Sequence, residues 1–109
     1  MDDPNQIEVP PSFVALFTTP GGHRLTEPMS HVRVRYELCE DMAQMLTEQA
    51  GTLLFKTGGS ERDVLSALRV ALSGPESALQ EDELSWVLTR LAELLGWEPP
   101  EAPAHPLPR

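Results

Sequence analysis

The chain has 109 residues, of which 17 are acidic and 8 are basic, so its formal net charge is -9. This length fits one domain, and the negative charge disfavours nucleic acid and anionic membrane surfaces as partners. The single cysteine, Cys39, excludes a disulfide within the chain, and without a leader-like or membrane-length apolar run we expect a cytoplasmic protein.

The N-terminal part of the chain is predicted to contain one short helix. Residues 1–9 are polar and are expected to be disordered. Two prolines then introduce the apolar segment 12–17, whose Phe13, Leu16 and Phe17 share one helical face. Because a helix this short is not stable by itself, we expect it to dock onto the remaining helices.

The dominant predicted element is a long helix over residues 28–55. It rests on an apolar stripe whose members recur at alternating steps of three and four, which is the spacing of one buried helical face. The stripe consists of Met29, Val32, Tyr36, Cys39, Ala43, Leu46, Ala50 and Leu53. The glycine pair that follows the helix, Gly58 and Gly59, is expected to end it.

The same helix carries a second apolar face. Val34, Leu38 and Met45 lie roughly opposite the main stripe, where a surface helix is usually polar. One interpretation is that this face binds a partner, either another protein or a second copy of the chain in a homodimer. The other is that the 12–17 segment and the last helix cover both faces within one monomer.

Two further helices are predicted in the C-terminal half. The first begins at Ser60, which forms an S-x-x-D capping arrangement with Asp63 in which the hydroxyl can accept a hydrogen bond from an amide of the first turn. Gly74 as C-cap and Pro75 as a stop are expected to end it. The second spans residues 81–95, with three acidic residues in its first turn and Gly96 as its C-terminal cap.

These elements define the predicted organisation of the chain. Residues 98–109 contain five prolines and are expected to form a disordered Pro-rich tail, as residues 1–9 form a disordered N-terminus. Residues 10–97 form the folded domain. The predicted fold class is all-α, a small helical bundle of one short and three longer helices.

Trp86 is the most unusual residue of the last predicted helix. The helical wheel points it away from the apolar face and toward Glu83, Arg90 and Glu93, where Arg90 could stack on the indole. An exposed Trp is a candidate for a binding hot spot, unless the N-terminal segment or the tail covers it. The candidate interaction residues are Trp86, Arg90, Val34, Leu38 and Met45.

No catalytic, cofactor-binding or metal-binding residue is predicted. Cys39 lies on the buried stripe among acidic neighbours, which favours an unreactive thiol. The three histidines have no metal-ligand spacing. Residues 51–57 lack the second glycine of a phosphate-binding loop, and residues 53–55 within them are expected in the core. We therefore expect no cofactor and regard an enzyme as the less favoured interpretation.

Three stretches of the sequence resemble a known family. They are PPSFVALF at residues 10–17, RYELCEDMAQMLTEQA at 35–50 and WVLTRLAELLGW at 86–97. Together they resemble small uncharacterised proteobacterial proteins that sometimes carry the label "ATPase with chaperone activity". The resemblance implies a bacterial cytosolic protein and brings a chaperone function into consideration. No phosphate-binding loop supports the ATPase part of that label.

Three functions are therefore considered. The favoured one is a non-enzymatic protein-interaction or adaptor module of the bacterial cytosol that acts through a helical surface. The alternative is an ATP-independent, chaperone-like binder of apolar polypeptide segments, with a groove between residues 12–17 and the long helix as its site. An ATP-dependent enzyme is disfavoured, because phosphate binding usually requires a glycine-rich loop.

Overall fold

The computed structural model describes residues 8–100, and every regular element within them is a helix. The two segments expected to be disordered, residues 1–9 and 98–109, lie outside this part of the chain except for residues 8–9 and 98–100. The elements, in chain order, are α1 (Pro11–Val14), the 3-10 helix η1 (Ala15–Phe17), α2 (Met29–Thr57), α3 (Glu61–Leu72) and α4 (Glu81–Leu95). The all-α prediction of one short and three longer helices is confirmed.

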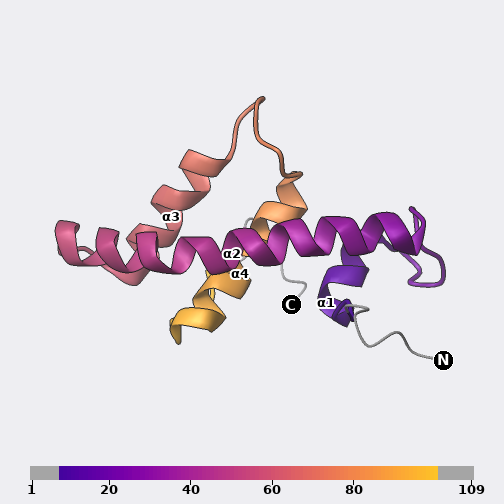
Figure 1. Ribbon diagram of the computed structural model, residues 1–109, viewed down its shortest axis with the longest axis horizontal. Helices are drawn as coiled ribbons and strands as arrows, with labels where there is room; N and C mark the ends of the chain where they lie inside the picture. The colour runs from indigo at the N-terminus through magenta and orange to yellow at the C-terminus, as the bar shows by residue number, and fades with distance from the viewer. Residues whose placement is uncertain (1–7, 101–109) are drawn as a thin grey trace, which may run out of the picture.

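The long helix α2 is the central element of the fold. Its 29 residues correspond to a length of about 43 Å, at the usual helical rise per residue. Figure 1 shows α4 crossing α2 near its middle, α3 folding back from its C-terminal end and α1 lying beside its N-terminal half. Gly58, with φ of 66°, ends α2 in the left-handed conformation, and its amide donates to the carbonyl of Leu54 at 3.0 Å.

The core is built on the stripe predicted along α2. Val32, Cys39 and Ala43 are fully buried, whereas Met29, at the start of the stripe, is 38% exposed. The buried side chains that meet the stripe come mainly from α3 and α4, and they include Val64, Leu65, Leu68, Leu84, Val87, Leu88 and Leu91. Burying one such aliphatic side chain contributes roughly 1.5–3 kcal/mol, so this contact surface stabilises the fold. No helix in the described part of the chain has the length and apolar character needed to cross a membrane.

Most helix ends in the described part of the chain follow the sequence signals. The Ser60 hydroxyl accepts from the Asp63 amide at 3.0 Å, as predicted. Gly96 caps α4 with φ of 74°, and the following amide of Trp97 reaches the carbonyl of Ala92 at 2.8 Å. The prediction for α3 is wrong by one position: Ser73, in an extended conformation, is the C-cap, and Gly74 belongs to the following turn.

The N-terminal segment, comprising α1 and η1 (residues 11–17), docks through Phe13. This side chain is 0% exposed, and its ring centroid lies 5.6 Å from that of Tyr36 on α2 and 5.1 Å from that of Trp86 on α4. The chain then returns to α2 through a loop closed by one antiparallel bridge between Thr18 and Leu25. One aromatic residue therefore attaches the segment to two helices at once.

Candidate functional site

Trp86 is half-buried and does not stand free on a polar face. Its indole packs edge-on against Phe13 and Tyr36, with ring centroids 5.1 and 5.8 Å apart. Its Nε1 donates a hydrogen bond to the hydroxyl oxygen of Ser12 at 3.0 Å. The N-terminal segment therefore covers one side of the ring, which is the alternative that the sequence left open.

Glu83 is a buried residue, although the helical wheel placed it on the solvated side of α4. Only 1% of it is exposed. Arg35 on α2 donates to the Glu83 carboxylate from Nε to Oε2 at 2.9 Å and from Nη2 to Oε1 at 2.6 Å. The backbone N–H of Gln80 also donates to Oε1, at 2.9 Å. Burial by itself raises the pKa of Glu83, but these hydrogen bonds outweigh it and hold that pKa below its ordinary value. Glu83 is therefore a charged link between α4 and α2.

Arg90 forms a second ionic link between the same two helices. Its Nε and Nη2 donate to the Glu40 carboxylate at 3.0 to 3.3 Å, and its Nη1 donates to Glu93 at 3.2 Å. The hydrogen bonds from Arg90 are the main cause of the lowered pKa of Glu40. Arg90 thus directs its donors to two carboxylates, and its charge is largely balanced.

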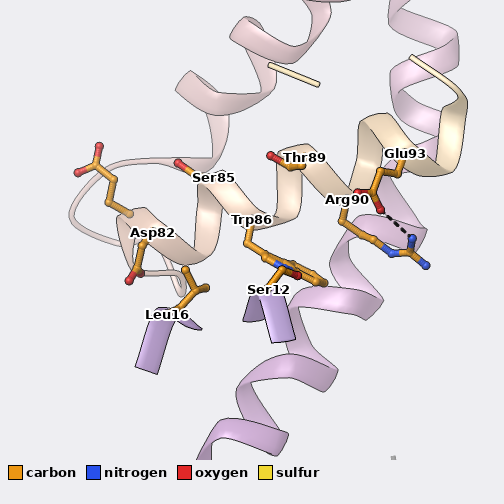
Figure 2. A pocket seen from close by; sticks show the side chains of 9 residues that line it. Ser12, Leu16, Asp82, Ser85, Trp86, Thr89, Arg90 and Glu93 are labelled. Atoms are coloured by element: carbon orange, nitrogen blue, oxygen red, sulfur yellow. Dashed lines mark hydrogen bonds and ion pairs between the residues drawn. The ribbon is translucent and has the colours of Figure 1, made fainter. Parts of the chain in front are cut away.

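A cleft of about 560 Å³ lies between the N-terminal segment and the outer face of α4. In Figure 2, Trp86 projects from α4 toward Ser12 in the middle of the view, with Leu16 and Asp82 on the left and Arg90 on the right. This α4 cleft is lined by Ser12, Leu16, Glu81, Asp82, Ser85, Trp86, Thr89, Arg90 and Glu93. Its size is within the range of ordinary ligand-binding sites. The groove considered for the chaperone function lies between residues 12–17 and the long helix, whereas this cleft lies between the same segment and α4.

The chemistry of the α4 cleft combines an apolar floor with an acidic margin. The indole of Trp86 and the side chain of Leu16 supply the apolar surface. Glu81, Asp82 and Glu93 add three carboxylates, against the single guanidinium of Arg90. Neither Glu81 nor Asp82 forms an ion pair within residues 8–100, so two carboxylates at the margin have no cationic partner there.

The second predicted face of α2 is exposed at two of its three positions. Val34 is 62% and Met45 is 74% exposed, whereas Leu38 is half-buried and packs against the core. The expectation that Phe55 belongs to the core is wrong, because it is 86% exposed. Phe55 lies on the side of α2 away from the buried stripe, so its neighbours Leu53 and Leu54 gave no guide to its position.

The described residues show no arrangement suited to metal or thiol chemistry. Burial, and secondarily the nearby Glu83 carboxylate, raises the pKa of the Cys39 thiol to about 12. A thiol in this state is a weak nucleophile, in agreement with its place on the apolar stripe. Between residues 8 and 100, no cluster of three or more His, Cys, Asp or Glu side chains is suited to hold a metal ion.

Comparison of the chain with protein-family models, with curated proteins and with solved structures found no match. The resemblance to the proteobacterial family therefore stays a prediction. The geometry of the α4 cleft is the ground on which a function can be proposed.

Proposed function

We propose that the protein is a non-enzymatic polypeptide-binding module, of the adaptor type, that holds a segment of a partner protein in the α4 cleft. The observation that carries this proposal is the placement of Trp86. Phe13 and Tyr36 fix one part of its ring, and its remaining surface lines the cleft. A Trp held in this way is typical of binding hot spots, which combine a rigid aromatic side chain with a pocket.

The fixed geometry also favours binding energetically. Because the Nε1 donor is already satisfied by Ser12, the indole presents its apolar surface to a partner without leaving a polar atom unpaired. A ring that is immobilised before binding loses little conformational entropy when a partner arrives. The described residues contain no strand that could accept a β-strand from a partner. A partner would therefore be recognised through side chains that enter the cleft, as a helix does in a groove.

Fluorescence of Trp86 tests the proposal directly. The chain has two tryptophans, so Trp97→Phe leaves Trp86 as the only indole. This variant is titrated with short amphipathic peptides that carry Leu on one face and Lys, Gln or Glu on the other. We expect a saturable change in Trp86 emission with at least one peptide, because an apolar side chain replaces water at the ring.

A matched pair of substitutions controls the site of binding. Thr89→Tyr adds a neutral ring inside the cleft, whereas Thr52→Tyr adds the same ring to an exposed position on α2. We expect Thr89→Tyr to remove the saturable change and Thr52→Tyr to preserve it. The proposal fails if no peptide changes the emission, or if the change survives Thr89→Tyr undiminished.

A chaperone-like function is a second candidate, favoured by apolar side chains outside the cleft. Phe55, Met45, Val70 and Val34 are 86%, 74%, 74% and 62% exposed. Such side chains can hold unfolded segments without ATP. Suppression of aggregation of a reduced client protein tests this function. The suppression should weaken in Phe55→Ser and Met45→Ser but persist in Thr89→Tyr. A wild-type protein that suppresses no aggregation at molar excess would refute the chaperone-like function.

We place this function in the bacterial cytosol, a proposal that the single buried thiol supports. A reducing compartment suits a chain that uses Cys39 as a small apolar side chain. The ATP-dependent alternative is tested by calorimetric titration with Mg-ATP. We expect no saturable heat, and saturation at micromolar nucleotide would contradict a non-enzymatic module.

A further inference from the structure

We infer that the occupant of the α4 cleft is a basic amphipathic segment of a partner protein, in which Lys or Arg side chains flank a large apolar side chain. This inference rests on the polypeptide-binding function proposed above and adds the chemistry of the partner.

The charges of the cleft favour a cationic partner. Three of its lining residues are carboxylates, and its one lining guanidinium, that of Arg90, is bound to Glu40 and Glu93. A second guanidinium, that of Arg69, donates to the hydroxyl of the lining residue Ser85 at 3.3 Å, so the carboxylates remain in excess. Glu81 and Asp82 favour the helix dipole in the first turn of α4, but this role does not neutralise them. Because both line the same cleft as Trp86, the flanking cations of a bound segment would lie near unpaired negative charge.

The apolar floor favours a large anchoring side chain. Trp86 and Leu16 leave room in a cleft of about 560 Å³ for a Leu, Met or Phe side chain. The face of an indole also attracts a Lys or Arg cation, so the same ring suits both parts of the segment.

Other occupants are less compatible with these charges. An acidic segment would be repelled by the cleft, and a second copy of this chain would bring a further net charge of -9. The partner that complements both the floor and the margin is therefore a basic amphipathic segment.

A pair of charge-neutralising substitutions in the cleft, compared with a matched control pair on α2, tests the inference. Glu81→Gln/Asp82→Asn removes the two carboxylates at the cleft margin that form no ion pair within residues 8–100. Glu37→Gln/Asp41→Asn removes the same two residue types from exposed positions on α2, with the same change in net charge. Both pairs are made in the Trp97→Phe protein, and the Leu–Lys, Leu–Gln and Leu–Glu peptides are titrated at low and high salt.

We expect the Leu–Lys peptide to bind most tightly and the Leu–Glu peptide least tightly. Neutralising the cleft pair should weaken Leu–Lys binding about fivefold and reduce its dependence on salt, whereas the α2 pair should change it less than about twofold. Equal losses from both pairs would overturn the inference, because the attraction would then come from the overall charge.

The peptide series separates this inference from the proposed function. If Leu–Gln binds as tightly as Leu–Lys and Thr89→Tyr abolishes both, the cleft binds polypeptide but the inferred basic partner is wrong. If no peptide binds at the cleft, the proposed function and this inference both fail.

Discussion

Removal of the Phe13 ring is the perturbation that most directly probes how the cleft is built. Phe13 is 0% exposed, and its ring lies within 5.6 Å, between centroids, of Phe17, Tyr36 and Trp86. Truncating a fully buried Phe to Ala usually costs about 3–5 kcal/mol. Domains of this kind are stable by about 5–15 kcal/mol, so Phe13→Ala should still fold while losing much of its stability.

The stability lost in Phe13→Ala cannot exceed the free energy with which the N-terminal segment docks onto the other helices. Phe13 is the one residue of α1 and η1 that is buried. If undocking costs less than about 3 kcal/mol, the variant avoids the cavity by releasing the segment, and the measured loss equals the docking free energy. Trp86 emission in the Trp97→Phe background distinguishes these outcomes, because release of the segment exposes the indole and shifts its emission to longer wavelength.

Urea unfolding followed by circular dichroism measures the change in the free energy of unfolding. Phe55→Ala is the matched control, because the same side chain is 86% exposed there and its loss should change stability by less than about 0.5 kcal/mol. A Phe13→Ala protein that is within about 1 kcal/mol of wild type and has unchanged Trp86 emission would refute the docking described above.

Other predictions concern the ionic links, the thiol and a helix end. Glu83→Ala should lower the free energy of unfolding in urea by about 3 kcal/mol, because it strips the partly buried Arg35 of its partner. The hydrogen bonds to Glu83 lower its pKa in the folded protein, so the stabilisation that Glu83 provides is complete above the pKa of the unfolded chain, about 4.3. This stabilisation is lost as the pH falls through the pKa that Glu83 has in the folded protein. The acid side of the stability profile should therefore be flatter in Glu83→Gln. Cys39, with its pKa raised to about 12, should resist a thiol-specific reagent at mildly alkaline pH until urea unfolds the chain, and labelling of the native protein would contradict its burial. Gly96→Ala should lower stability by about 1 kcal/mol in a thermal melt, since a Cβ strains a residue with φ of 74°, and an unchanged melt would contradict that conformation.

The helices were predictable because each carries its signals locally. The range 81–95 of α4 is confirmed at both ends, since acidic residues mark its first turn and Gly96 its cap. The stripe on α2 predicted the burial of Cys39 and Ala43, because periodicity alone decides which side of a helix meets the core. The bounds of α2 shifted by one or two residues, as helix ends commonly do.

The candidate site was less predictable, because it depends on pairings between distant parts of the chain. A helical wheel treats a glutamate as solvated, so it could not show that Glu83 meets Arg35, 48 positions earlier. One local signal was available: Glu83 follows Gln80 by three residues, and a capping box folds such a glutamate back onto the chain. Nothing local indicated that Ser12 and Phe13 would reach Trp86, because a docking partner 74 residues away leaves no periodic trace.

The most direct test of the α4 cleft as a polypeptide-binding site is an amide chemical-shift map by NMR during titration with the Leu–Lys peptide. We predict that the perturbed amides cluster at Ser12, Leu16, Ser85 and Thr89, together with the indole N–H of Trp86, which all lie at the cleft. Perturbations confined to the exposed face around Val34 and Met45, or no perturbation at saturating peptide, would contradict the cleft as the binding site.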